Sequence, residues 1–543
     1  MDLYEMAKAR LAREKGGLTI DRAAAVRFAL AFPNEYRVAM ASLGYQLVYR
    51  MINELPNASC ERVFLPDKVD LKEYVRTKTE LLTLESLSPL SEFDVVGFSI
   101  SFEMDCLNIL RILKLSNLPI KCADRDDYDP VIIAGGPCAT FNPEPLADFI
   151  DAFVIGDAEN VLSDLVDVLE RGRDKPRSDM LQELATVAGV YVPSLGNRAV
   201  RQIAMDLNSH PCASVIRTDE AGFGDTELVE IARGCGRKCR FCVAGHITRP
   251  PRQRDIRNEC RGFDKVGLVG AAVFDHPDAM GICESIVASD GQFSTSSIRL
   301  ETVTDEIASL MAASGQRTLT IAPEAGSAKL RRVINKNATD GQIFSAVSSA
   351  YAAGINRVKL YFMIGLPTET NEDISAIIDL VSRLANEFST VNFQVSASSF
   401  VPKPWTPFQW HAMECESVLK KRYAMLRAGI SSIKGASFSG ESPRLATIQG
   451  YLARGDRRMG AVLEAALAND GDYPAALRET GIDIVEYIYT DRTFDEKLPW
   501  ENNIDNRLSR DYLWNEYQKA LGEQITAQCD VGTCKLCGAC SKI

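Results

Sequence analysis

Short apolar runs alternate with amphipathic stretches along most of the chain. This alternation is typical of a parallel sheet covered by helices. In the N-terminal third it predicts strands over residues 26–32, 95–100, 131–134 and 152–155. Further along it predicts six strand–helix units, with strands over residues 228–232, 265–269, 297–300, 318–321, 357–363 and 391–396. Six units in one direction predict a partial TIM-type barrel, in which chemistry takes place at the carboxyl ends of the strands.

Beyond residue 410 the strand pattern stops and helical periodicity takes over. We therefore expect an α/β protein in which an N-terminal doubly wound parallel sheet precedes a partial (β/α)6 barrel and a mostly helical C-terminal region. The expected domains are a helical extension (1–25), the doubly wound sheet (26–173), a linker (174–223), the barrel (224–410), the helical region (411–528) and a cysteine-rich tail (529–543).

Composition narrows the function classes. Apolar residues make up 46% and charged residues 25% of the chain, which is ordinary for a globular protein. No apolar run reaches the roughly 18 residues of a membrane span, and the charged N-terminus lacks the apolar core of a signal peptide. We therefore expect a cytoplasmic protein. The net charge of -12 argues against sequence-independent binding along a nucleic-acid backbone.

A reducing compartment disfavours disulfides, so the 15 cysteines point to metal ligation or catalysis. Seven of them fall into two clusters. In the first, Cys235, Cys239 and Cys242 have the spacing C-x3-C-x2-C and follow a predicted strand. Three thiolates can hold one corner of an iron–sulfur cubane and leave one iron open. At that iron S-adenosylmethionine (SAM) can bind and accept an electron. A zinc site with His246 as fourth ligand is the alternative.

Basic residues crowd around the first cysteine cluster. They favour either a solvated face or a site for an anionic substrate or cofactor. They are Arg233, Arg237, Lys238, Arg240, Arg249, Arg252, Arg254, Arg257 and Arg261. A second arginine motif, residues 454–458, is another candidate for binding phosphate or carboxylate groups.

The C-x3-C-x-Φ-C loop resembles the radical SAM superfamily, and three later motifs agree with that resemblance. They are residues 320–327, 362–370 and 402–407, similar to the superfamily's fourth, fifth and sixth strand motifs. The resemblance implies a 4Fe-4S cluster held by Cys235, Cys239 and Cys242. It also implies SAM contacts from Phe241, Asp275, Glu324, Ser327, Ile364, Gly365 and Pro367. The usual Gly-Gly-Glu of strand two is replaced here, so Asp275 is only a candidate for SAM's amino group.

The N-terminal segments resemble the cobalamin-binding domain that precedes many radical SAM cores. The resemblance implies a corrinoid over the carboxyl edge of the sheet, with contacts from Ser99, Gly135, Gly136 and Gly156. The Asp-x-His-x-x-Gly ligand motif of other cobalamin proteins is absent, and residues 26–173 contain no histidine. A domain that keeps the fold without the cofactor is the alternative.

The second cluster, Cys529, Cys534, Cys537 and Cys540, has the spacing C-x4-C-x2-C-x2-C. Four thiolates so close together can surround one metal centre. An auxiliary 4Fe-4S cluster, a structural zinc and a redox-active thiol set all fit this spacing. Much of the chain, residues 26–540, resembles one uncharacterised radical SAM family that pairs a cobalamin-type domain with the barrel.

We therefore expect a radical SAM enzyme that modifies an unactivated carbon, with cobalamin-dependent methyl transfer as the leading reaction. Radical sulfur insertion or rearrangement with an auxiliary cluster, and a non-catalytic iron–sulfur electron-transfer protein, are the alternatives. The expected partner is a low-potential electron donor such as flavodoxin or ferredoxin. The sequence does not identify the substrate, and the two arginine groups admit an anionic metabolite or RNA.

Overall fold

The computed structural model describes residues 2–256, 260, 262–295, 298–530 and 533–540. The chain forms two compact units, each assembled from three segments. Unit 1 consists of Met1–Glu227, Leu452–Asp483 and Lys497–Arg507, and unit 2 of Leu228–Tyr451, Ile484–Glu496 and Leu508–Ile543. Arg257 and Arg261 of the basic group, and Ser297 of a predicted strand, lie outside the described residues.

Unit 1 is built on a six-stranded sheet in the order β3-β2-β4-β5-β6-β7. The first five strands in this order are parallel, and β7 is antiparallel at the edge. The six strands are β2 (Val26–Phe32), β3 (Ala58–Phe64), β4 (Val95–Ser99), β5 (Val131–Gly135), β6 (Ala152–Val154) and β7 (Val190–Tyr191). The predicted doubly wound sheet is confirmed, and its strand order reverses between β2 and β4.

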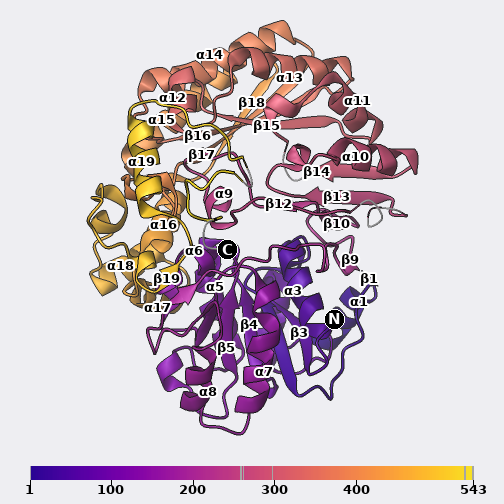
Figure 1. Ribbon diagram of the computed structural model, residues 1–543, viewed down its shortest axis with the longest axis vertical. Helices are drawn as coiled ribbons and strands as arrows, with labels where there is room; N and C mark the ends of the chain where they lie inside the picture. Colours follow the sequence, from indigo (N-terminus) through magenta and orange to yellow (C-terminus); the bar gives the residue numbers. More distant parts are fainter. Residues whose placement is uncertain (1, 257–259, 261, 296–297, 531–532, 541–543) are drawn as a thin grey trace. The chain divides into compact units, whose positions relative to one another are not determined.

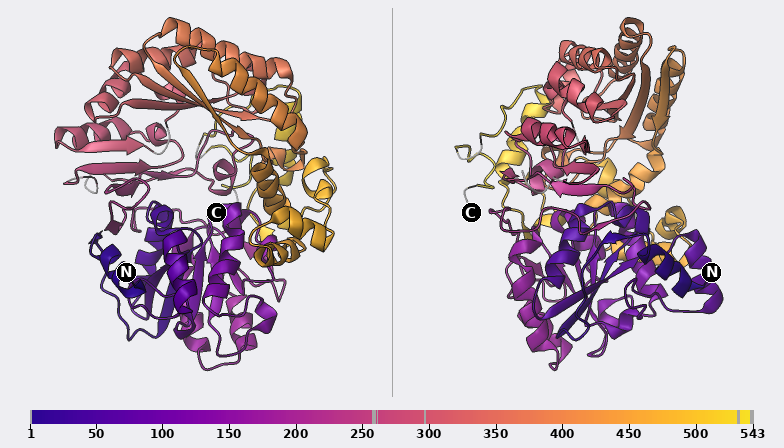
Figure 2. Two further views of the ribbon diagram at one scale, coloured as in Figure 1. Left: turned by 180° about the vertical axis from the view of Figure 1, so that it is seen from behind. Right: turned by 90° about the vertical axis from the view of Figure 1, so that its right-hand side faces the viewer.

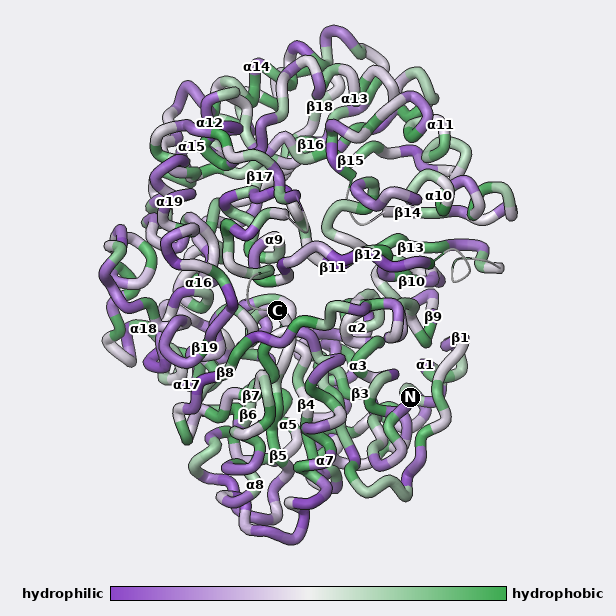
Figure 3. The backbone as a smooth tube through the Cα atoms, viewed as in Figure 1, coloured by the Kyte–Doolittle hydropathy of each residue, from purple (hydrophilic) through white to green (hydrophobic). Residues whose placement is uncertain are grey.

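Alternating strand residues face the two sides of this sheet. On one face Phe28, Leu30 and Ile133 pack against α3 (Leu43–Asn53) and α7 (Leu162–Gly172) in a continuous core. Helix α5 (Cys106–Leu115) is buried along one side and belongs to the same unit. Figures 1 and 2 show helices on both sides of the sheet, and Figure 3 shows hydrophobic positions concentrated along its strands.

Strand β3 is absent from the predicted set because two charged residues interrupt its apolar pattern. Glu61 and Arg62 are each 2% exposed. The Glu61 carboxylate accepts hydrogen bonds from the hydroxyls of Thr83 and Ser86, at 2.6 and 2.5 Å. Arg62 forms an ion pair with Glu14 at 2.8 Å. Charged side chains whose hydrogen bonds and ion pairs are formed inside the protein can occupy a buried strand. Composition alone does not reveal such a strand.

Unit 2 carries two larger sheets that are separate from each other. The strands that form them are β10 (Glu227–Glu230), β13 (Lys265–Val269), β14 (Gln292–Thr295), β15 (Thr318–Glu324), β16 (Arg357–Ile364), β17 (Asn392–Ser399) and β18 (Ala436–Gly440). The order is β10-β13-β14 in one sheet and β15-β16-β17-β18 in the other. Among the described residues no ladder joins β14 to β15. The βα repeat expected of a partial barrel is therefore present without closure.

Two predicted positions in unit 2 are wrong. The third strand lies at Gln292–Thr295 instead of residues 297–300, because only Phe293 of that strand is buried and the pattern carries little signal. Leu300, which seemed to end a strand, begins a short 3-10 turn. Strand β18 follows residue 410, where none was expected, since its sequence Ala-Ser-Phe-Ser-Gly is mostly exposed.

Helices connect the strands of unit 2. They are α10 (Ala279–Ala288), α11 (Asp305–Ala313), α12 (Ala328–Val333), α13 (Asp340–Ala352), α14 (Asn371–Glu387) and α15 (Glu416–Ser431). The capping boxes at Thr339 and Thr370 begin α13 and α14. Toward the C-terminus the predicted helical periodicity is confirmed by α16 (Pro443–Arg454), α17 (Met459–Ala468) and α19 (Arg510–Leu521).

The first unit takes in segments from both the middle and the end of the chain. Residues 174–223, expected as a linker, contain α8 (Arg177–Leu184) and the edge strand β7. Strand β8 (Ala199–Val200) pairs in parallel with β19 (Ile504–Asp505). The Asn142 side-chain amide donates to the carbonyls of Ala453 and Gly455, at 2.9 and 2.8 Å. Within the described residues, no helix is long and apolar enough to cross a membrane.

Candidate active site

The loop that carries the first three cysteines begins at the end of strand β10. Its base is closed by β11 (Ala232–Arg233), which pairs antiparallel with β12 (Arg252–Gln253). Cys242 is followed by α9 (Ala244–Ile247). The cysteines therefore lie on an excursion of the chain at the carboxyl end of the strand, as the sequence predicts.

The turn into this loop requires glycine. Gly234 has φ +87°, and a Cβ placed on it would lie 2.6 Å from the carbonyl oxygen of Thr248 and 2.8 Å from that of Pro250. Both obstacles are backbone atoms, which cannot rotate away. The close approach at Gly234 therefore fixes where the cysteine loop leaves the strand.

Cys235 and Cys242 lie close enough to Cys239 to affect its ionisation. Burial raises the pKa of Cys239 to about 12, and repulsion from Cys242 and Cys235 adds to the effect. The cations Lys336 and Arg299 act in the opposite direction. Burial also raises the pKa of Cys242, although its sulfur accepts a hydrogen bond from the Gly245 amide at 3.3 Å.

The donor set suits an iron–sulfur cluster. The three thiols are soft ligands, and they lie beside cations and a backbone N–H group. The cations and the N–H group favour the thiolate form, which is the form that binds metal. Among the described residues, no group of three or more His, Cys, Asp or Glu side chains stands in a metal-binding arrangement. The metal would therefore have to draw the sulfurs together.

His246, the alternative fourth ligand, is a buried neutral imidazole. Its Nδ1 lies 2.8 Å from the carbonyl oxygen of Cys242, so the proton of the neutral ring belongs on Nδ1. Burial lowers the pKa of His246 to about 3, with a further contribution from Arg249. The side chain is therefore tied to the backbone of the cysteine loop.

Two residues expected to contact SAM lie at the end of strand β15 (Glu324) and just after it (Ser327). Glu324 has φ +65° and forms an ion pair with Lys336 at 2.9 Å, so Lys336 lies near both this carboxylate and Cys239. Ser327 accepts a hydrogen bond from the Leu330 amide and donates one of 2.6 Å to Asp373. Lys336 is a site residue that the sequence analysis does not identify, because a single lysine after a helix carries no pattern.

The end of β16 and the turn after it hold Ile364, Gly365 and Pro367. Ile364 is buried as the last residue of the strand, and Gly365 has φ +83°. The Gly365 amide donates to Glu369 at 2.7 Å. Burial raises the pKa of Glu369 to about 7, against the effect of the Gly365 amide and of Arg422, whose guanidinium lies 2.8 Å from the carboxylate. Glu369 and Arg422 therefore hold in place the turn whose backbone is expected to bind adenine.

Asp275 and Phe241 have different surroundings. Asp275 forms a bidentate ion pair with Arg237 of the cysteine loop, with Nε at 2.7 Å. Any contact from Asp275 to SAM would have to share this carboxylate with the arginine. Phe241 is half-buried, and in the sequence it lies between Cys239 and Cys242.

The basic group around the loop is not a solvated face, contrary to one of the two interpretations of the sequence. Five of its members are buried, namely Lys238, Arg240, Arg249, Arg252 and Arg254. Arg233 and Arg254 both form ion pairs with Glu230, at 2.8 and 2.6 Å. These cations serve internal partners, which weakens the case for an anionic substrate at this loop. In the second motif, Arg458 likewise pairs with Asp456.

In unit 1 the strand order reverses between β2 and β4, where open α/β sheets have their ligand crevice. Asn34, just after β2, donates to the buried carboxylate of Asp105 at 2.9 Å. Burial raises the pKa of Asp105 to about 6, although Asn34 and Asn108 both stabilise its ionised form. The sequence analysis does not identify this pair, because the two residues lie 71 positions apart.

Two of the glycines expected to face a corrinoid are already packed against the chain itself. A Cβ on Gly136 would lie 2.8 Å from the Ile100 carbonyl oxygen, and one on Gly156 would lie 2.2 Å from that of Gln202. Gly135 has more room, with Val154 at 3.8 Å. Ser99 is half-buried at the end of β4. Ser99 and Gly135 therefore remain the more accessible candidates.

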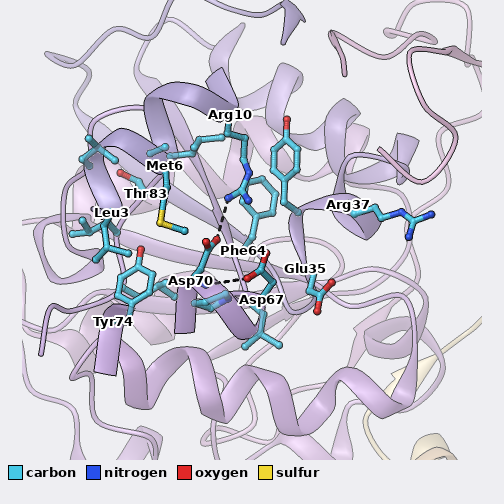
Figure 4. Close-up of a pocket in the computed structure, with 18 of the residues that line it drawn as sticks. Leu3, Met6, Arg10, Glu35, Arg37, Phe64, Asp67, Asp70, Tyr74 and Thr83 are labelled. Carbon is cyan, nitrogen blue, oxygen red and sulfur yellow. Dashed lines mark hydrogen bonds and ion pairs between the residues drawn. The ribbon is translucent and has the colours of Figure 1, made fainter. Parts of the chain in front are cut away.

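A separate cavity of about 330 Å³ lies in unit 1 beneath α1 (Leu3–Leu11). Its walls include Phe64 and Tyr74, and Figure 4 shows Arg10 directed toward Asp70 inside it. The two side chains form an ion pair at 3.4 Å. None of the residues expected to contact SAM or a corrinoid lines this cavity.

The second cysteine cluster lies against the first cysteine loop. The Cys529 amide donates to the Gly236 carbonyl at 2.8 Å. Lys238 Nζ lies 3.9 Å from the Cys534 sulfur. Figure 1 shows the C-terminal segment passing beside α9. Residues 531 and 532 of the tail lie outside the described part of the chain.

Comparison with known families agrees with these features. The family described as "Radical SAM proteins, N-terminal" matches residues 44–193. The radical SAM superfamily matches residues 229–381, which include the cysteine loop and strands β13 to β16. The chain therefore contains the N-terminal and core domains of radical SAM proteins, and these matches support an enzyme of that class.

Two relatives extend the comparison. The uncharacterized protein MJ0966 of Methanocaldococcus jannaschii is 29% identical over 489 residues, covering 88% of this chain and 98% of the relative. An uncharacterized methyltransferase of Pyrococcus horikoshii, PH0819, is 26% identical over 294 residues, covering 50% of this chain and 61% of the relative.

Among solved structures, the cobalamin-dependent SAM radical enzyme OxsB with aqua-cobalamin bound has a TM-score of 0.53 at 16% identity. The alignment covers 81% of this chain and 66% of that chain. The methyltransferase TsrM of Kitasatospora setae has a TM-score of 0.48 at 17% identity, covering 68% of this chain and 74% of that one. The likeness to OxsB establishes a shared fold.

Replacing Gly234 with alanine should prevent the cysteine loop from forming. Gly354 makes a matched control, because it has φ +83° but nothing within 4 Å of an added Cβ. Gly354→Ala should cost only the left-handed backbone penalty, about 1–2 kcal/mol. Gly234→Ala adds a clash with two carbonyls and should cost more. Urea denaturation and iron content after reconstitution measure both effects, and equal behaviour of the two variants would contradict this role for Gly234.

Asp105 should make the stability of the protein depend on pH. Because its pKa is raised to about 6, the folded state keeps a proton that the unfolded state releases above about pH 4. The free energy of unfolding should therefore fall by about 3 kcal/mol as the pH rises from about 4 to 6, and then level off. Asp105→Asn should remove this decrease. Parallel pH profiles of wild type and variant in urea would refute this assignment.

Proposed function

We propose that this radical SAM enzyme transfers a methyl group to an unactivated carbon with the help of cobalamin. The observation that carries the proposal is the loop that brings Cys235, Cys239 and Cys242 to the carboxyl end of β10. A methyltransferase among the relatives and a cobalamin-dependent enzyme with the same fold support the choice of reaction.

Cys235, Cys239 and Cys242 would hold a 4Fe-4S cluster. When bound, such a cluster supplies one electron to the sulfonium of SAM, whose cleavage yields methionine and a carbon radical. The chain's own contribution is placement. Gly234 fixes the loop, while Lys336 offers positive charge to both Cys239 and Glu324.

SAM would be held by the strand ends of unit 2. Ser327 and Glu324 would meet its ribose and methionine parts, and the backbone at Ile364, Gly365 and Pro367 its adenine. The support from Glu369 and Asp373 keeps these segments in place, because each accepts hydrogen bonds from the turn it stabilises. Phe241 would line the space beside the cluster, and Asp275 would meet SAM's amino group only by sharing its partner Arg237.

Cobalamin would lie at the carboxyl edge of the unit 1 sheet. The reversal of strand order between β2 and β4 supports this position. Ser99 and Gly135 would contact the corrinoid. Gly136 and Gly156 would shape the edge through their tight packing on Ile100 and Gln202.

The four tail cysteines would hold a second metal centre, for which we favour an auxiliary 4Fe-4S cluster over zinc. Their position beside the first loop and the cation Lys238 support a site of negative charge. A low-potential protein such as flavodoxin or ferredoxin would supply electrons. The substrate is proposed as an organic molecule or RNA whose methylated carbon carries no activating group.

Changing Cys235, Cys239 and Cys242 together to alanine should abolish SAM cleavage. The protein is purified without oxygen, reconstituted with iron and sulfide, reduced and given SAM, and 5'-deoxyadenosine and S-adenosylhomocysteine are measured. Wild type should release one or both, and the triple variant neither above background. Cys415→Ala provides the matched control, since Cys415 is exposed and distant in sequence from both clusters. Absence of both products from wild-type protein that contains the reconstituted cluster would rule out the proposed chemistry.

Cobalamin binding is tested separately. Wild type incubated with hydroxocobalamin should retain a corrinoid absorbance after gel filtration. Ser99→Tyr should lower the affinity at least tenfold by filling the edge of the sheet. Ser178→Tyr should leave it unchanged, because Ser178 is exposed and Arg177 beside it contacts the loop that precedes β5, at the opposite edge. A wild-type protein that retains no corrinoid would overturn cobalamin dependence while leaving the superfamily assignment intact.

A further inference from the structure

The tail that carries Cys529 to Cys540 is fastened to the first cysteine loop by buried polar contacts within unit 2. Arg240, which is 0% exposed, donates to the Gln524 carbonyl at 2.7 Å and pairs with Glu516 at 3.1 Å. The Asn335 side chain bridges the Lys238 and Thr526 carbonyls, at 3.2 and 3.1 Å. The tail therefore reaches its first cysteine already fixed to the loop.

At that point the two cysteine sets become neighbours. The Cys529 amide donates to the Gly236 carbonyl at 2.8 Å, and Gly236 follows Cys235 directly. With standard bond lengths this contact places the Cα atoms of Cys529 and Cys235 no more than about 11 Å apart. A Cβ added to Gly236 would touch Cys529 at 3.5 Å. The backbone of the loop thus forms part of the wall of the tail's site.

Two cations from the loop region reach the tail's sulfurs. Lys238 is 4% exposed, has φ +58°, and places its ammonium 3.9 Å from the Cys534 sulfur. A lysine is seldom found in this backbone region, and such a conformation persists only where its surroundings hold it. Arg249, 1% exposed, donates to Tyr512 at 3.3 Å and interacts electrostatically with Cys537. Thiolates in the tail would add negative charge beside both cations and strengthen these contacts.

We propose that the metal centre of the C-terminal tail acts as a clamp on the first cysteine loop, with Lys238 and Arg249 as the positioning residues that join the two sites. Thiolates formed when the tail binds metal attract both cations. Filling the tail site therefore holds residues 235–242 in the shape that their own cluster needs. The inference rests on the proposed iron–sulfur chemistry of that loop and gives the tail centre a role in it.

Thermodynamic linkage turns the clamp into a measurable coupling. If metal in the tail favours the loop's cluster-binding shape, loss of the tail metal must weaken cluster retention. Loss of the first cluster must also weaken tail-metal retention. Couplings between distinct sites usually correspond to a factor of about 5 or more.

The experiment follows the first cluster directly while an iron chelator is present. Only a cluster with an open iron changes its electron paramagnetic resonance spectrum when SAM is added, so the SAM-responsive part of the reduced signal reports this site. Wild type and Cys537→Ala/Cys540→Ala are reconstituted, challenged with the chelator and sampled over time. The tail variant should lose the SAM-responsive signal at least about fivefold faster.

Matched variants separate the clamp from general damage. Lys238→Met should also lose the signal several-fold faster, and Lys238→Arg should recover most of the wild-type rate. Lys535→Met removes the same charge from an exposed position in the tail and should behave like wild type. Cys415→Ala controls for the loss of a thiol.

The outcomes distinguish this proposal from the proposed function. Equal loss rates in wild type and both the tail and Lys238→Met variants would overturn the clamp while SAM cleavage stood. Wild-type protein without iron or zinc beyond the first cluster would overturn it as well. If wild type never shows a SAM-responsive signal, the proposed function fails instead, whatever metal the tail binds.

Discussion

The ion pair between Arg240 and Glu516 is the constraint on which the candidate active site depends. Arg240 lies within the loop of three cysteines, and Glu516 lies on α19. Their side chains are 0% and 2% exposed, so each charge has only its local partners to replace water. Desolvated charges of this kind are stable only when paired, which fixes the loop against the helix. The neighbouring cysteines and the segment after α19 take their positions from that contact.

Much of the fold could be predicted because apolar periodicity reports burial. Strands β2 and β13 lie at the predicted residues, and the doubly wound sheet follows from them. The apolar pattern fails to predict a strand where buried positions carry charged residues or where the strand is exposed. Strand β3 holds Glu61 and Arg62 inside the sheet through side-chain partners, whereas β18 is mostly exposed and has only Ala436 and Phe438 as apolar residues. Pairing between strands, and not composition, decides such cases.

The candidate site shows the same division. The cysteine spacing and the turn motifs could be identified because their chemistry requires particular residues at short intervals. The burial of Arg240 and the contact between Lys238 and Cys534 could not, since their partners lie hundreds of residues away. Nor does a glycine reveal what approaches it. Gly156 looked like a ligand contact in the sequence, but it accommodates the backbone of Gln202.

The composition of unit 1 has a consequence for how the protein is made. Its sheet is finished by residue 191, but α17 and strand β19 come from residues 459–505. Asn506 closes the arrangement by donating to the Thr140 carbonyl at 3.1 Å. During synthesis from the N-terminus, the first unit must wait until residues 452–507 have left the ribosome. Until then, the surface of unit 1 that α17 and β19 later cover stays exposed and is a natural target for a chaperone. A chain shortened before these elements would keep that surface exposed permanently.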